Sequence, residues 1–142
     1  MTFYDMIERA MFQYNVDVDD LEDYTPHVDA YVNEGYDLIL EALTGYHLRD
    51  LPVFPPLNQE TDMDVEPKVP LWTHQPICDY ATYLLYRNGN PQKQNRGREY
   101  LMRFNECLRR CKDLRGGASV NMETGEITVD HITTHQFINY WP

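Results

Sequence analysis

The 142-residue sequence predicts a mainly α-helical protein: an antiparallel four-helix bundle with a long proline-rich loop and a C-terminal β-hairpin plus tail. Three observations predict this class. Apolar residues recur at intervals of three and four along four segments, which places them on one face of a helix. Five prolines crowd residues 50–70, and no regular element tolerates that density. Beyond residue 117 apolar residues alternate with polar ones, as is typical of strands.

Two helices are predicted in the N-terminal half, over residues 2–14 and 26–45. Thr2 is a suitable N-cap for the first, and Asp5 follows in its first turn, where the helix dipole favours an acidic side chain. Thr25–Pro26 predicts the start of the second helix, because proline is favoured at the first helical position. Gly45 is a suitable C-terminal stop.

Two more helices are predicted after the proline-rich loop. The third begins near Thr73 or Pro76 and ends at Asn88. The fourth begins at Asn90–Pro91 and ends at Gly116–Gly117, because an N-cap residue precedes proline and two glycines follow the last apolar position. We expect a buried apolar seam along this fourth helix. Its members are Gly97, Leu101, Phe104, Leu108 and Cys111.

A β-hairpin is predicted near the C-terminal end. Val120 and Met122 precede the turn at residues 123–126, and Ile127 and Val129 follow it. An alternating pattern around a short glycine-containing turn is typical of a hairpin. Two strands alone are marginal in water, so we expect this hairpin to pack on the helices or on a neighbouring subunit. We divide the chain into a helical domain, 1–115, and a hairpin with a C-terminal arm, 116–142.

The two halves of the chain carry opposite charge. Residues 1–67 contain 16 acidic and 2 basic residues, residues 68–142 contain 7 acidic and 10 basic residues, and the total is −11. One interpretation is an acidic surface and a basic helix that are simply solvated. The other is a molecule with one negative and one positive surface, which can meet head to tail between identical subunits. The acidic total argues against general affinity for nucleic acid, whose phosphates it repels.

The second interpretation predicts an interface. We expect acidic residues of the first interhelical turn to meet basic residues of the fourth helix in a neighbour, with aromatic residues of the tail adding apolar contact. The predicted interface residues are Asp17, Asp19, Asp20, Glu22, Asp23, Arg109, Arg110, Lys112, Arg115, Phe137, Tyr140 and Trp141.

The composition indicates an intracellular protein. Three cysteines are an odd number, which argues against a disulfide framework and fits a reducing compartment. No apolar run approaches the roughly 18 residues that span a bilayer, and the first residues lack a secretory signal pattern. A virion component that assembles inside a cell would have the same features.

Motifs for catalysis are not found, and we predict no enzyme activity, no cofactor and no metal. One zinc site could be composed from Cys107, Cys111, His131 and His135, because zinc takes sulfur and nitrogen ligands tetrahedrally. Cys111 lies on the apolar seam, however, where a free cysteine behaves as a small hydrophobic residue. We therefore favour packing over metal binding for this pair of cysteines.

Five short motifs follow one another between residues 26 and 112. They are YVNEGY at residues 31–36, Leu51–Pro52, ICDYATYLLY at residues 77–86, Gly89–Asn90–Pro91, and RGREYLMRF at residues 96–104. In this order they resemble the head-to-tail connector (adaptor) proteins of tailed bacteriophages. The unusually proline-rich loop, the hairpin and the aromatic tail depart from that pattern.

The resemblance implies a structural protein of the virion neck, assembled in the host cytoplasm. It implies a ring of about twelve subunits between the portal and a downstream neck or tail protein. DNA would pass through the ring without specific binding, along a wall whose negative charge repels phosphates. The alternatives are a small acidic interaction module, such as an inhibitor or a DNA mimic, and a zinc-binding protein. A DNA mimic would not concentrate nine basic residues between Arg87 and Arg115.

Overall fold

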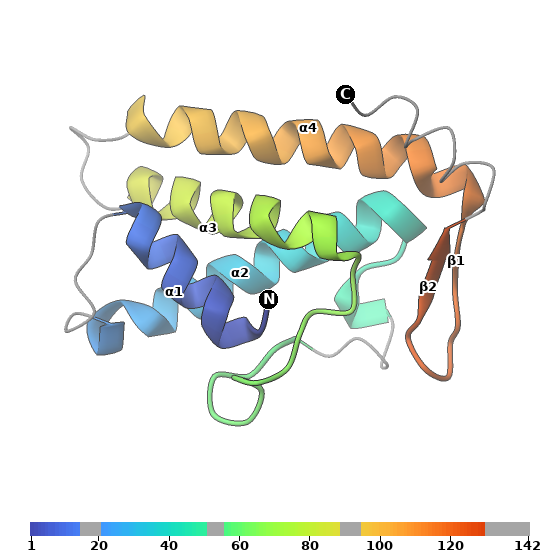
Figure 1. The fold of residues 1–142 in the computed structure, drawn as a ribbon, viewed down its shortest axis with the longest axis horizontal. Coiled ribbons are helices and arrows are strands. Elements are labelled where there is room, and N and C mark those ends of the chain that lie inside the picture. Colours follow the sequence, from blue (N-terminus) through green and yellow to red (C-terminus); the bar gives the residue numbers. More distant parts are fainter. Residues whose placement is uncertain (15–20, 51–55, 89–94, 130–142) are drawn as a thin grey trace.

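The computed structural model describes residues 1–14, 21–50, 56–88 and 95–129, with the backbone alone for 21–26 and 129 (Figure 1). This part of the chain is mainly helical, as predicted. Its α-helices are α1 (Phe3–Tyr14), α2 (Leu21–Thr44), α3 (His74–Asn88) and α4 (Arg98–Leu114). Single turns of 3-10 helix, η2 (Leu48–Asp50), η3 (Leu71–Thr73) and η5 (Arg115–Gly117), adjoin them.

The N-terminal end of α1 is capped as the sequence predicts. The backbone N–H of Asp5 donates to Thr2 Oγ1 (3.1 Å), and the backbone N–H of Thr2 donates to Asp5 Oδ2 (3.0 Å). This reciprocal pair satisfies N–H groups that the helix itself leaves free. Two further N–H groups, of Phe3 and Tyr4, donate to carbonyl oxygens of the later loop.

The predicted start of α2 at Thr25–Pro26 is wrong. The helix begins five residues earlier, at Leu21, and Pro26 lies in its second turn. At this position proline lacks the N–H that would bond one turn back and its ring crowds that carbonyl, so the helix continues through Pro26 at a local cost. The end of α2 agrees with the prediction: Gly45 adopts φ 82° and its N–H donates to Glu41 O at 2.8 Å.

Residues 56–70 of the proline-rich loop are bonded to the helices. The side chain of Asn33, on α2, donates to Leu57 O (2.9 Å) and accepts from Leu57 N–H (2.8 Å). The N–H of Lys68 donates to the Tyr36 hydroxyl at 3.1 Å. Side chains of Leu57 and Val69 are buried. This part of the loop therefore belongs to the packed fold rather than lying loosely across its surface.

The helices α3 and α4 form a close pair. The start of α3 at His74, directly after η3, agrees with the predicted start near Thr73. For α4, the predicted start at Asn90–Pro91 lies outside the described residues, and residues 95–97 form a 3-10 turn before the α-helix begins at Arg98.

The apolar seam of α4 is rotated from its predicted position. Phe104 and Cys111 are buried as expected, but Leu101 and Leu108 are only half-buried. Cys107 and Leu114 are buried in their place, and the prediction missed both. The reason is that α4 packs against α2 as well as α3, so its buried stripe turns toward both neighbours.

The pair formed by α2 and α3 occupies the centre of the fold. Each of these two helices packs against α1 and α4 as well as against the other, and α1 and α4 lie on opposite sides of α3 (Figure 1). Close approach is possible at Gly35, where a Cβ would lie 3.2 Å from Ile77 Cγ2. The largest fully buried side chains around this centre include Phe3, Met6, Tyr36, Ile39, Leu40, Ile77 and Phe104.

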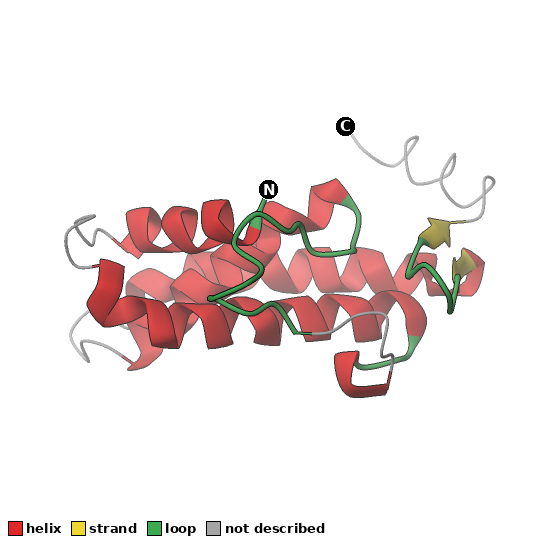
Figure 2. Cartoon of the chain, turned by 90° about the horizontal axis from the view of Figure 1, so that it is seen from below, coloured by secondary structure: helices red, strands yellow, loops and turns green. Residues whose placement is uncertain are grey.

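The predicted β-hairpin is present at one end of the helices (Figure 2). Strands β1 (Ala118–Val120) and β2 (Ile127–Val129) are antiparallel, with Val120 opposite Ile127. Gly125 adopts φ 78° in the turn. Val120 and Ile127 pack partly on the core, and β1 contacts α2. The hairpin thus packs on the helices of its own chain, which was one of the two expectations, while the division into domains at residue 115 stays a prediction.

Candidate functional site

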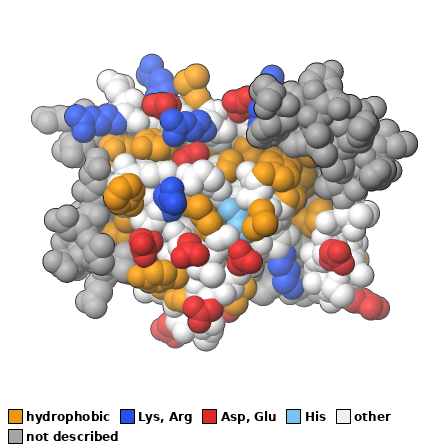
Figure 3. All heavy atoms as spheres, in the orientation of Figure 1, with side chains coloured by type: hydrophobic (Ala, Val, Ile, Leu, Met, Phe, Trp, Pro, Cys, Tyr) orange, Lys and Arg blue, Asp and Glu red, His pale blue; other side chains and the backbone are white. Residues whose placement is uncertain are grey.

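The outward side of α4 carries a stripe of exposed residues that we call the cationic stripe. It consists of Arg98, Met102, Asn105, Arg109 and Lys112. Their spacing of four and three residues places them on one side of the helix, away from the buried stripe. Figure 3 shows Lys and Arg side chains gathered along the edge that α4 forms. This spacing is visible in the sequence, but a count of charges does not tell which basic residues of the helix lie on the exposed side.

The flanks of the stripe are internally balanced. Arg103 pairs with Glu99 at 2.6 Å and Arg110 with Glu106 at 3.2 Å, each one turn apart on α4. Arg110 was a predicted interface residue, and the structure engages it in this pair. Within the described residues, the side chains of Arg98, Arg109 and Lys112 have no hydrogen-bond or ion-pair partner. These three carry the net positive charge of the stripe.

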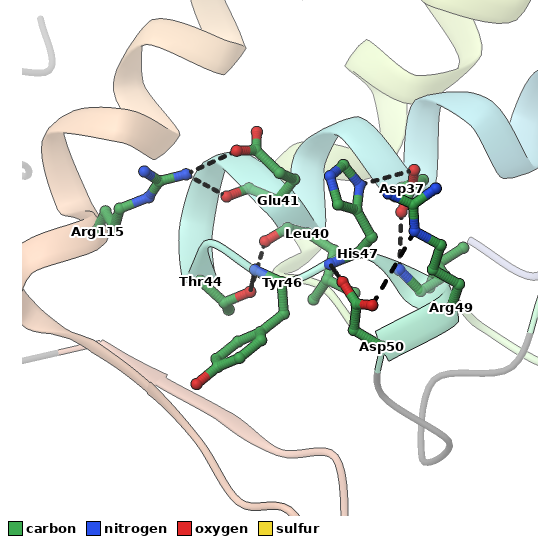
Figure 4. A network of polar contacts seen from close by, with 10 residues as sticks. Asp37, Leu40, Glu41, Thr44, Tyr46, His47, Arg49, Asp50 and Arg115 are labelled. Atoms are coloured by element: carbon green, nitrogen blue, oxygen red, sulfur yellow. Dashed lines mark hydrogen bonds and ion pairs between the residues drawn. The ribbon is translucent and has the colours of Figure 1, made fainter.

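Arg115, also a predicted interface residue, is bonded inside the chain. Its guanidinium donates to the backbone oxygen of Glu41 and pairs with the Glu41 carboxylate at 3.1 Å (Figure 4). It also donates to the backbone oxygen of Ala42. These carbonyls belong to the last turn of α2, where the helix dipole favours a cation, and Glu41 O also accepts from Gly45 N–H. Arg115 therefore fixes the end of α4 and the start of the hairpin against α2.

A second set of bonds closes the chain after α2. The Asp37 carboxylate contacts His47 Nδ1 (3.1 Å) and accepts from Leu48 N–H (2.7 Å), while Asp50 accepts from His47 N–H (3.3 Å) (Figure 4). Arg49 extends next to this group with its side chain largely in solvent. These bonds hold η2 against α2, so the polar side chains of Asp37, His47 and Asp50 have a structural role.

A second surface, which we call the acidic face, lies at the opposite edge of the fold from α4. It consists of Asp5 and Glu8 of α1 together with Glu60, Asp62, Asp64 and Glu66 of the loop. Figure 3 shows Asp and Glu side chains across this lower half. The loop is held in place because Val65 O accepts from Phe3 N–H (2.8 Å) and Met63 O accepts from Tyr4 N–H (3.0 Å).

Some of these carboxylates have partners and others do not. Asp62 accepts from Asn58 N–H at 2.7 Å, and Glu66 pairs with the Met1 amino group at 2.7 Å. Hydrogen bonds from the backbone and hydroxyl of Thr2 hold the pKa of Asp5 below its usual value. Glu60 and Asp64 are exposed, and among the described residues their side chains have no partner.

One carboxyl group is buried between α1 and α3. Asp79 is 3% exposed, and Gln75 Nε2 donates to it at 3.1 Å. Gln13 joins the group by accepting from Gln75 (2.8 Å) and donating to Thr82 (2.7 Å). Burial raises the pKa of Asp79, while Gln75 and Arg103 oppose the rise. A raised carboxyl pKa is also typical of catalytic sites, but these contacts form a polar joint between the two helices.

The cysteine half of the proposed zinc site lies in the core. Cys107 and Cys111 are buried, and a hydrogen bond with Cys107 together with burial raises the pKa of the Cys111 thiol. His131 and His135 lie outside the described residues. Over residues 1–14, 21–50, 56–88 and 95–129, no group of three or more His, Cys, Asp or Glu side chains is arranged to hold a metal ion.

The remaining predicted interface residues are not placed by the structure. Asp17, Asp19 and Asp20 lie outside the described residues, and so do Phe137, Tyr140 and Trp141. Glu22 and Asp23 lie in the first turn of α2, where the backbone alone is described.

Comparison with models of protein families, with curated proteins and with solved structures finds no match to this chain. None of the helices in the described part of the chain is both long enough and apolar enough to cross a membrane.

Proposed function

We propose that this protein is a structural subunit that assembles head to tail into a ring, as the connector between the portal and the next neck or tail component of a tailed phage. The observation that carries the proposal is the position of the cationic stripe and the acidic face at opposite edges of the fold (Figure 3). Two complementary surfaces so placed are out of reach of each other within one subunit. They are satisfied when each subunit contacts the next, and such contacts form a ring where the rotation closes.

The helical architecture supports a structural role. We propose that the four helices form an antiparallel bundle, since α2, α3 and α4 alternate in direction and pack together (Figure 1). In the ring this bundle would act as a rigid unit of the virion neck, assembled in the host cytoplasm, with no catalytic centre or cofactor. The net charge of −11 would repel the phosphates of DNA moving through the channel, so the duplex would pass without being held.

Electron micrographs of the purified protein, with and without its portal, test the proposal. We expect rings that lie coaxially on the portal. The control is the portal alone, imaged under the same conditions. A protein that neither forms rings nor binds the portal would contradict the assignment as a connector.

The acidic face also favours a second candidate, a small acidic interaction module that acts as an inhibitor or DNA mimic. Such a module would bind a basic, DNA-binding partner through Glu60 and Asp64, and the cationic stripe would be unnecessary for binding. Competition between this protein and duplex DNA for a basic partner would support the module. A stoichiometric zinc content, measured by elemental analysis, would instead support the zinc-binding alternative at Cys107 and Cys111.

A further inference from the structure

We propose that the cationic stripe of one copy docks on the acidic face of the next copy, with Met102 packed against Tyr4 and Val65. The inference rests on the proposed function, because it names the two surfaces that would meet at each contact in the ring. It keeps Arg109 and Lys112 of the interface predicted from the sequence, but it replaces the acidic residues around Asp17 and the aromatic tail with other partners.

Each surface has an apolar centre. Met102 is 65% exposed between Arg98 and Asn105 in the cationic stripe, and Tyr4 and Val65 are 40% and 41% exposed beside the carboxylates of the acidic face. The backbone segments that carry Tyr4 and Val65 lie side by side, because the carbonyls of Met63 and Val65 accept from the first N–H groups of α1. Methionine makes favourable contacts with aromatic rings. An apolar centre inside a charged rim is the usual anatomy of a protein interface.

The charged rims are complementary. On one surface Arg98, Arg109 and Lys112 have no partner within the described residues, and on the other the same is true of Glu60 and Asp64. Glu8 raises the pKa of the Tyr4 hydroxyl, so a further carboxylate of α1 lies near the apolar centre. Opposite charges around the rim set the register and orientation of the contact more than its strength.

The positions of the two surfaces determine the kind of contact. Because α1 and α4 lie on opposite sides of α3 (Figure 1), the stripe cannot reach the acidic face of its own copy. A contact between two different surfaces is heterologous, so it leaves one free copy of each surface and recruits another subunit. A second copy of this chain is therefore the occupant that the charges and the geometry favour.

A charge-swap experiment tests the contact. One variant carries Arg109→Glu and Lys112→Glu, and the other carries Glu60→Lys and Asp64→Lys. Since all four side chains are exposed and without partners among the described residues, we expect wild-type melting of both. In each variant alone, like charges then face each other at the contact. Its self-association, measured by sedimentation velocity, should weaken about tenfold or more. An equimolar mixture restores an attractive pair at every contact, and it should assemble like the wild type.

The matched control is a single reversal away from both surfaces. Arg49→Glu makes the same chemical change as Arg109→Glu at an exposed arginine of η2, which is paired only at 4.0 Å, with Asp50. We expect Arg109→Glu to weaken assembly and Arg49→Glu to leave it unchanged. Equal effects of the two, or a mixture of the charge-swap variants that stays dissociated, would overturn the inference.

Cross-linking detects the contact even where association is weak. In a chain carrying Met102→Cys and Val65→Cys, a short bis-maleimide should link successive copies into a ladder, while the three native cysteines are buried. The control pairs Val65→Cys with Met122→Cys, a similarly exposed methionine in the hairpin turn. A ladder with Met102→Cys but not with Met122→Cys supports the docking. The absence of a ladder from the Met102 variant overturns it.

The outcomes separate this inference from the proposed function. If wild-type rings bind the portal while both charge-swap variants still assemble alone, the connector assignment stands and the docking surfaces are wrong. If the charge swap and the cross-links succeed but no portal is bound, self-assembly through these surfaces stands and the connector assignment fails.

Discussion

Truncation of Phe104 gives a sharp test of how α4 packs on α3. The ring is 1% exposed, and its centroid lies 4.4 Å from that of Tyr80, on α3. Phe104→Ala removes a fully buried aromatic side chain, which costs about 3–5 kcal/mol in the free energy of unfolding. Of this, roughly 0.5–1.5 kcal/mol belongs to the contact between the two rings. The loss is a large part of the ~5–15 kcal/mol available to a domain.

Thermal unfolding followed by circular dichroism measures the effect. For a protein of this size we expect the midpoint to fall by roughly 6–20 °C. The control on the same helix is Met102→Ala, whose side chain is mostly in solvent and should change stability by at most about 0.5 kcal/mol. Leu101→Ala, at a half-buried position, should lie between them. The packing of α4 described above is refuted if the Phe104 and Met102 variants melt together.

Three further predictions concern polar contacts. Asn33→Ala removes both bonds to Leu57 and should lower the free energy of unfolding, measured by urea titration, by about 1–3 kcal/mol. Residues 56–70 should also be cleaved faster by proteases. An unchanged digest would contradict the prediction. Arg115→Ala should cost about 1 kcal/mol, and Arg115→Lys should recover only part of it, because lysine cannot bridge Glu41 and Ala42. Since the folded-state pKa of Asp79 is raised above 3.8, the folded state binds more protons, and this residue lowers stability as pH rises through that window. The stability of Asp79→Asn relative to the wild type should therefore increase as pH rises, measured by urea titration. Parallel profiles of unfolding free energy against pH would exclude this.

Local signals in the sequence were sufficient where a few neighbouring residues set the backbone. Thr2 with Asp5 at the start of α1, and Gly45 at the end of α2, adopt the predicted caps because each bonds within one turn of the helix. The hairpin was equally local, since its turn and alternation lie within a dozen residues. The helix start predicted at Thr25–Pro26 was wrong because this pair indicates only where a helix is able to start. The residues before it, from Leu21, are already helical.

The positions of side chains relative to other helices could not be predicted in this way. The seam through Leu101 and Leu108 assumed one neighbour for α4, whereas two neighbours turn the buried stripe toward Cys107 and Leu114. The count of basic residues did not distinguish Arg110 and Arg115, whose side chains are bonded within the chain, from Arg98, Arg109 and Lys112, whose side chains have no partner in the part of the chain that the structure describes.

The sequence by itself determined the helical class, most helix ends, the hairpin and the opposite charge of the two halves, because these depend on local bonding and on composition. The tertiary structure alone decided that the acidic loop lies beside α1 and that α4 lies at the far edge. Those positions depend on contacts between residues far apart in the chain, such as Asn33 with Leu57 and Phe3 with Val65. Charge in a sequence becomes a surface only when such contacts fix which side chains share an edge of the molecule.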